Sequence, residues 1–99
     1  MLSTHKGYHK YAFKFLNREL ALIHWLPLDK TRVHGHNGKK CTFVPFSSGL
    51  NETIIKSDGR YTRTSYNKFK IGYIDDKIGV HQIENTTNKN ILSFHYYRN

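Results

Sequence analysis

The 99 residues carry 16 lysines and arginines against 7 acids, which gives a formal net charge of +9 and a pI near 9.8. One cysteine, Cys41, excludes an intrachain disulfide scaffold, and no apolar run approaches the roughly 18 residues that a membrane-spanning helix requires. We therefore predict a cytoplasmic protein without integral membrane association, folded as one basic domain over residues 1–99.

The first predicted element is an amphipathic helix over residues 8–26. Apolar side chains recur near helical period at Tyr8, Ala12, Phe15 and Leu22, and Pro27 ends the pattern. Basic residues at a spacing of four would form a cationic ridge on the solvent face of this helix. The ridge consists of Lys6, Lys10, Lys14 and Arg18.

Strand and turn signals follow from residue 31 onward. The pair Asn37-Gly38 favours a two-residue hairpin turn between arms at Thr31–His36 and Lys39–Val44. Further strands are predicted over residues 52–56, 60–67, 69–73, 78–83 and 91–97, with turns at Asp58-Gly59 and Asp75-Asp76. The predicted fold class is α+β, with the N-terminal helix packed on a mostly antiparallel sheet of about five or six strands.

The predicted hairpin places His34 opposite Cys41, with His36 on the same face. These residue types can hold Zn²⁺ or form a His-activated thiolate, and a further metal ligand would come from a remote residue such as His24 or His81. A free cysteine is more often a small buried hydrophobe. We therefore predict that the protein binds no metal and no cofactor. If it does bind a metal, the candidate ligands are His34, His36 and Cys41.

Metal-independent RNA cleavage is a second possibility, because it needs only a general base, a general acid and cations beside the phosphate. The C-terminal half supplies such groups at His81, His95, Arg63 and Lys70. The strand–turn–strand run over residues 60–83 is similar in outline to the C-terminal hairpin of RelE-like ribosome-dependent ribonucleases, without a diagnostic motif. This hypothesis is a small endoribonuclease of toxin type.

The preferred hypothesis is a non-enzymatic, small basic nucleic-acid-binding protein or accessory factor of phage type. Alternating aromatic and basic residues suit base stacking beside phosphate contacts, on DNA or RNA. The predicted contact residues are Lys6, Lys10, Lys14, Arg18, Arg32, Lys39, Lys40, Arg60, Tyr61, Arg63, Tyr66, Lys68 and Lys70. A third hypothesis is an inhibitor that binds an acidic surface of a host protein through its aromatic side chains.

Overall fold

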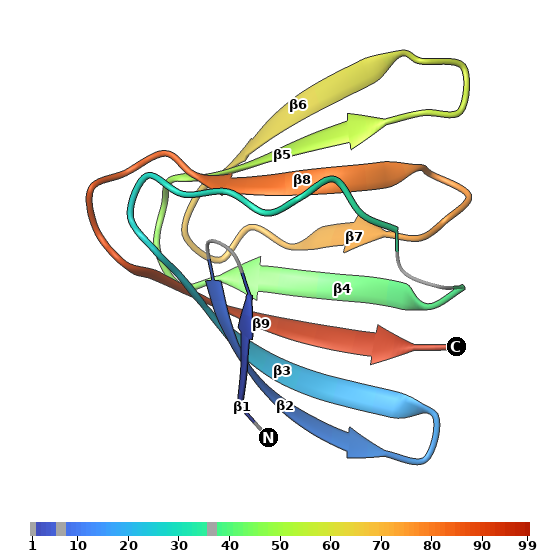
Figure 1. Ribbon diagram of the computed structural model, residues 1–99, viewed down its shortest axis with the longest axis horizontal. Helices are drawn as coiled ribbons and strands as arrows, with labels where there is room; N and C mark the ends of the chain where they lie inside the picture. The colour runs from blue at the N-terminus through green and yellow to red at the C-terminus, as the bar shows by residue number, and fades with distance from the viewer. Residues whose placement is uncertain (1, 6–7, 36–37) are drawn as a thin grey trace.

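The computed structural model describes residues 2–5, 8–35 and 38–99, and within these ranges every regular element is a strand (Figure 1). The strands are β1 (Leu2–His5), β2 (Tyr8–Phe15), β3 (Arg18–Trp25), β4 (Lys40–Pro45), β5 (Leu50–Ile55), β6 (Tyr61–Tyr66), β7 (Gly72–Ile74), β8 (Val80–Asn85) and β9 (Ile91–Arg98). The predicted α+β class is therefore wrong. Among the described residues no helix is long and apolar enough to cross a membrane.

The strands form two antiparallel sheets that enclose the core. The large sheet has the order β1-β2-β3-β9-β4-β7, and the small sheet has the order β6-β5-β8. One cluster of buried hydrophobic side chains draws on both sheets, with Trp25 and Phe43 from the large sheet and Leu50 and Ile83 from the small one. In β3 and β8 buried positions alternate with more exposed ones, as expected for strands with one face on a core.

The predicted helix over residues 8–26 is wrong, because this segment forms the β2–β3 hairpin. Phe15 pairs with Arg18, so the turn consists of Leu16 and Asn17. Residues four apart lie on one side of a helix, but they also lie on one side of a strand. The regular spacing of the basic residues therefore fits both structures. In the hairpin, Lys10 and Lys14 lie on the side of β2 that approaches Glu19, where Lys10 is largely covered and Lys14 stays exposed.

The predicted hairpin between residues 31–36 and 39–44 is also wrong. Strand β4 pairs with β9 and β7, while the preceding segment runs beside β8. That segment forms bridges from Lys30 to Glu84 and from His34 to His81. The eight residues of β9 offer β4 a long partner in the sheet, and this pairing outweighs the local turn signal. His36 and Asn37 lie outside the described residues.

The later predicted elements agree better with the structure. Strands β5, β6, β8 and β9 overlap their predicted ranges, and β4 ends at Pro45 as expected. Asp58-Gly59 forms the predicted turn between β5 and β6, with Gly59 at a φ of 87°. Asp75-Asp76 likewise lies in the turn before β8, where Asp75 accepts backbone hydrogen bonds from Lys77 and Ile78. The predicted strand over residues 69–73 is wrong in its first part, because Phe69 takes a positive φ of 66° in a turn and β7 begins at Gly72. The rest of the C-terminal half was predictable from local patterns.

Candidate functional site

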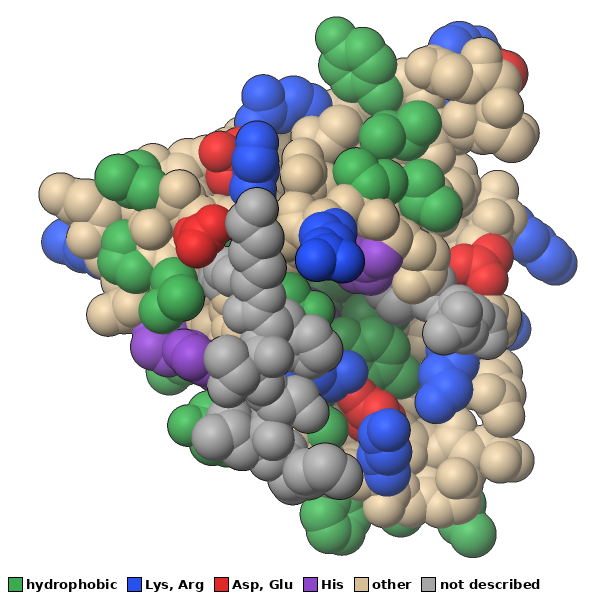
Figure 2. Space-filling view, viewed as in Figure 1, with side chains coloured by type: hydrophobic (Ala, Val, Ile, Leu, Met, Phe, Trp, Pro, Cys, Tyr) green, Lys and Arg blue, Asp and Glu red, His purple; other side chains and the backbone are tan. Residues whose placement is uncertain are grey.

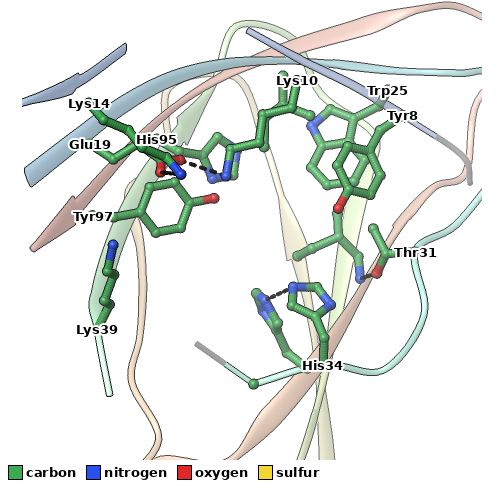
Figure 3. Close-up of a pocket in the computed structure, with 14 residues that line it drawn as sticks. Tyr8, Lys10, Lys14, Glu19, Trp25, Thr31, His34, Lys39, His95 and Tyr97 are labelled. Carbon is green, nitrogen blue, oxygen red and sulfur yellow. Dashed lines mark hydrogen bonds and ion pairs between the residues drawn. The ribbon is translucent and has the colours of Figure 1, made fainter. Parts of the chain in front are cut away.

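A pocket of about 290 Å³ is lined by residues of both sheets and of the segment that runs beside β8. His34 lines one end, and Lys10, Lys14 and Glu19 line the other (Figure 3). His81 also lines the pocket and contacts His34. The face in Figure 2 is hollowed at its centre, with basic side chains around the hollow. The volume is near the lower limit of ordinary ligand sites, about 300 Å³, so the pocket suits a small ligand.

His34 and His81 meet because their backbones form a mutual pair of hydrogen bonds. Each residue's N–H donates to the carbonyl of the other at 2.9 Å. The two side chains lie on the same side of this bridge, and their Nε2 atoms are 3.1 Å apart. The contact joins residues 47 positions apart in the chain.

The outer hydrogen bonds of these two histidines fix their tautomers. His34 Nδ1 lies 2.9 Å from the Arg32 carbonyl, and His81 Nδ1 lies 2.7 Å from Glu52 Oε2. A carbonyl and a carboxylate only accept, so both Nδ1 atoms carry protons and both Nε2 atoms present lone pairs. The two Nε2 atoms, 3.1 Å apart, can therefore share one cation, either a proton or a metal ion.

Glu52 holds His81 from behind the pocket. Its Oε2 accepts from His81 Nδ1, and its Oε1 accepts from the Tyr66 hydroxyl at 2.8 Å. Glu52 is 1% exposed and His81 4%. Burial, followed by the Glu52 charge, raises the pKa of Tyr66, which therefore stays protonated and donates. A carboxylate that accepts from the outer nitrogen of a histidine is the usual support of a metal-binding histidine.

A second buried network lies on the large sheet, beside the pocket. Trp25 Nε1 donates to Ser93 Oγ at 2.7 Å, and Ser93 Oγ is hydrogen-bonded to His95 Nε2 at 2.6 Å. His95 Nδ1 faces Cys41 Sγ at 3.8 Å. The network therefore joins Trp25 through Ser93 and His95 to Cys41.

Cys41 pairs with Tyr97 across β4 and β9 and not with His34. Burial is the largest cause that raises the pKa of the Cys41 thiol to about 12, and a hydrogen bond joins the thiol to Tyr97. Burial and the neighbouring Cys41 also raise the pKa of Tyr97 well above its ordinary value. At neutral pH Cys41 is therefore a thiol, which does not match the thiolate that a nucleophile or metal ligand requires.

The cationic end of the pocket is built on the β2–β3 hairpin. Lys10 Nζ lies 2.6 Å from Glu19 Oε2 and 4.6 Å from the centre of the Tyr97 ring. Lys14 Nζ lies 3.7 Å from Glu19 Oε1, and Lys39 lines the same pocket. The lysines outnumber the acid, so this end attracts an anionic group.

The remaining predicted site residues are spread over the molecule. Arg63 forms an ion pair with Glu84, and Lys70 lies over the Tyr66 ring at 5.3 Å. Tyr66 is buried, which removes it from base stacking, while Tyr61 is 69% exposed. The other described members, at turns, strand ends or exposed positions away from the pocket, are Arg18, Arg32, Lys40, Arg60 and Lys68. Lys6 lies outside the described residues.

Sequence reasoning missed Glu19, Glu52, Trp25 and Ser93. The alternation of Ser93, His95 and Tyr97 along β9 was the one available signal, because polar residues at a period of two can share the inner face of a strand. The acids gave no comparable signal. Their roles depend on partners on other strands, which the sequence does not place.

Solved structures similar to this fold include cupins and oxalate enzymes. The chain is 10% identical to an oxalate decarboxylase of Lactobacillus farciminis, with a TM-score of 0.86, and covers 31% of that chain while all of this one is covered. A recombinant oxalate oxidase is 13% identical, with a TM-score of 0.81. The match covers 97% of this chain and 53% of the oxidase chain. A cupin domain of Bordetella pertussis is 11% identical, with a TM-score of 0.75 and 98% coverage of both chains.

These likenesses establish a cupin fold, and the chain spans less than two thirds of the length of the oxalate enzymes. No curated protein matches the sequence. Residues 10–99 match the family described as Cysteine dioxygenase type I. The match overturns the predicted nucleic-acid-binding function, together with the alternatives of a metal-independent ribonuclease and a host-protein inhibitor. Nucleic acid or an acidic protein as a partner stays a prediction. The chain belongs to the cysteine dioxygenase type I family.

Proposed function

We propose that the protein is a metal-dependent thiol dioxygenase that converts a small thiol of the cysteine type to its sulfinate. The observation that carries the proposal is the 3.1 Å approach of the Nε2 atoms of His34 and His81 inside a pocket with a cationic far end. The family to which the chain belongs is named for a dioxygenase that acts on cysteine, which supports the same reaction.

His34 and His81 fit a metal ion. Two nitrogen atoms 3.1 Å apart can both reach one ion at about 2.1 Å. Imidazole suits iron, and histidines hold iron(II) in non-haem oxygenases. Iron(II), when bound, supplies electrons for the activation of O₂ and a position for the sulfur of the substrate. His36 stays a predicted third ligand, and it lies outside the described residues.

The proposed reaction balances without another reductant. The thiol R–SH and O₂ give the sulfinic acid R–SO₂H, in which both oxygen atoms are bonded to sulfur. The O–O bond breaks, two S–O bonds form, and sulfur loses the four electrons that O₂ gains. The thiol proton passes to the sulfinic acid and, at neutral pH, to solvent.

The residues of the chain bind and orient the thiol. Lys10 and Lys14 attract a carboxylate to the end of the pocket opposite His34, and Lys39 adds positive charge to the lining. Trp25 and Ile83 add apolar wall between the two ends, which limits water around the reacting sulfur. A ligand held by its carboxylate therefore extends its thiol toward the two histidines.

The test is turnover with isotopically labelled O₂. Protein loaded with iron(II) under argon is mixed with L-cysteine and labelled O₂, and the product is analysed by mass spectrometry. We expect cysteine sulfinate that carries both labelled oxygen atoms, and loss of the product in the His81→Ala protein. Absence of sulfinate from the iron-loaded protein, or a sulfinate with one labelled oxygen, would overturn the proposal. A reducing cytoplasm suits both a thiol substrate and the free Cys41, and we propose that location with the function.

A further inference from the structure

We infer that the end of the β2–β3 hairpin is a docking surface for an anionic membrane. Apolar side chains at the tip of the hairpin enter the lipid, and a row of cations beside the tip contacts the headgroups. None of the side chains that form this surface lines the pocket, so docking does not depend on the proposed reaction.

The turn of the hairpin presents a leucine that neither packing nor backbone geometry explains. Leu16 is 99% exposed and has a φ of 51° at the first position of the two-residue turn. Glycine and asparagine are favoured at a turn position with positive φ, and a bulky apolar residue there is an outlier. Leu16 therefore strains the turn and gains almost no burial within the fold. A backbone outlier of this kind points to a function.

Two phenylalanines extend the apolar surface from the tip along β2. Phe13 and Phe15 lie on the face of β2 opposite to Lys14, with ring centres 5.8 Å apart, and they are 67% and 39% exposed. Single exposed apolar residues are ordinary, but a contiguous group marks an interaction site. Aromatic and aliphatic side chains next to basic ones are typical of protein surfaces that enter the interface of a bilayer.

A row of three cations lies beside the apolar tip. Arg18 stands opposite Arg98, and Arg98 stands opposite Lys40, at the end of the large sheet that carries the turn (Figure 1). Like charges directly opposite each other destabilise a sheet. Among the described residues no ion pair includes any of the three. Asp75, which follows β7 next to the row, accepts instead from the Tyr73 hydroxyl and from the backbone of its own turn.

The charge of the protein selects an anionic bilayer over a second copy of the chain. A second copy would bring another net charge of +9 and an identical row of cations to the interface. An anionic bilayer offers negative headgroups and an apolar layer at the same time, which matches the cations and the apolar tip of the hairpin. The tip and the row are then stabilised by one partner.

The experiment measures binding to lipid vesicles. Wild-type protein is co-sedimented with vesicles of equal parts phosphatidylcholine and phosphatidylserine, and with vesicles of phosphatidylcholine alone, at low and at high salt. We expect binding to the anionic vesicles that high salt weakens, and little binding to phosphatidylcholine alone. Failure of wild type to bind the anionic vesicles at low salt would overturn the inference.

The apolar tip is tested by Leu16→Asn, with Leu28→Asn as the matched control. Asparagine tolerates a positive φ, so the turn is retained while the apolar group is lost. Binding to anionic vesicles should fall by about tenfold or more in Leu16→Asn, as expected when a leucine no longer enters the lipid. Leu28 is also exposed, with a φ of 56°, but it follows β3 at the opposite end of that strand. Leu28→Asn should bind as wild type does, and equal losses in both variants would contradict the inference.

The row of cations is tested by two double variants that each remove two positive charges. Arg18→Gln with Arg98→Gln should weaken binding by more than about tenfold. Lys68→Gln with Lys89→Gln changes exposed lysines in the loops after β6 and β8, and binding should stay within about threefold of wild type. Equal losses in the two double variants would mean that net charge alone attracts the protein, and the hairpin end would not be the docking surface.

Insertion of the tip is tested with a fluorophore. Acyl-chain-brominated phosphatidylcholine mixed with phosphatidylserine should quench the Leu16→Trp protein and leave the Tyr61→Trp protein on β6 unquenched, over a constant background from buried Trp25. No quenching in the Leu16→Trp protein would overturn the inference. Analytical ultracentrifugation without lipid tests the other occupant. A wild-type dimer that becomes a monomer in Leu16→Asn would show that the hairpin end joins two copies, and membrane docking would be wrong.

Discussion

The two ends of the pocket are built in different ways. At the histidine end, His81 and Glu52 are both nearly inaccessible, and short hydrogen bonds fix each polar atom. At the cationic end, the side chain of Lys10 is 23% exposed and that of Lys14 is 70% exposed. The first arrangement is rigid, and the second consists of long side chains held by charge.

This difference indicates how each end should respond to substitution. A buried hydrogen-bonded group has few alternative positions, so loss of one partner should abolish or strongly weaken metal binding. Exposed charged side chains are screened and can rearrange, so their substitution should change ligand preference gradually. Metal affinity and ligand selectivity should therefore be separable by substitution.

The largest effect is expected for His81→Ala. The variant removes one of the two converging Nε2 atoms, and we expect iron(II) to bind more than about 100-fold more weakly, since loss of a supporting residue alone typically costs 10–100-fold. Competition with a chromophoric chelator measures the change. His24→Ala is the control, because His24 lies on the other face of β3 and contacts Asn90. Metal affinity of His81→Ala within tenfold of wild type would contradict the assignment.

Glu52→Gln should produce the next largest effect, about 10–100-fold weaker iron(II) binding. Glutamine keeps the shape of the side chain but loses the charge that His81 Nδ1 and the Tyr66 hydroxyl both contact. Glu84→Gln is the matched control on the same sheet, where the acid is exposed and pairs with Arg63. The same chelator competition applies, and equal affinities for Glu52→Gln and Glu84→Gln would show that the Glu52 contact does not support the site.

Ser93→Ala should affect stability and spare metal affinity. The substitution removes the hydroxyl that accepts from Trp25 and is hydrogen-bonded to His95 inside the core, which should cost about 1–3 kcal/mol of the free energy of unfolding. Urea unfolding measures this loss. Ser65→Ala, which removes an exposed contact to Asn51, should cost less than about 0.5 kcal/mol. A large loss of iron(II) affinity in Ser93→Ala would mean that the two networks are coupled.

Local patterns predicted much of the C-terminal half, but the first half required information on distant partners. The spacing of Lys10 and Lys14 fits a helix and a strand equally, so periodicity alone could not distinguish them. The Asn37-Gly38 pair is typical of a hairpin turn, which would pair β4 with the segment just before it. Instead β4 pairs with β9, about fifty residues later. Long-range strand pairing decided both segments.

The candidate site was predicted by residue type and not by arrangement. His34 was singled out as a metal candidate, and His81 as a remote ligand and as a catalytic residue, yet their meeting depends on a bridge between segments far apart in the chain. The positive charge was interpreted as a surface for polyanions, whereas Lys10 and Lys39 line the pocket. Net charge predicts attraction to anions in general and does not indicate the size of the anion.

The smallest predicted effect concerns Asp75, in the turn that leads into β8. Backbone hydrogen bonds from Ile78 and Lys77 and the hydroxyl of Tyr73 lower the pKa of Asp75 below its ordinary value of 3.8. Because the folded-state pKa is the lower one, the ionised carboxylate stabilises the fold above pH 3.8. This contribution disappears as the pH falls through the folded-state value.

Asp75→Asn should therefore lower the stability slightly at neutral pH and reduce its loss on acidification below pH 3.8. Thermal unfolding of wild type and variant across this acid range measures both changes. Iron(II) affinity at neutral pH should stay unchanged, because Asp75 shapes the turn and makes no contact with His81 or Glu52 among its hydrogen bonds. A variant whose stability falls as steeply with acid as that of wild type would show that the turn carboxylate does not stabilise the fold. A marked fall in metal affinity would instead mean that the histidine end depends on the turn as well as on its buried hydrogen bonds.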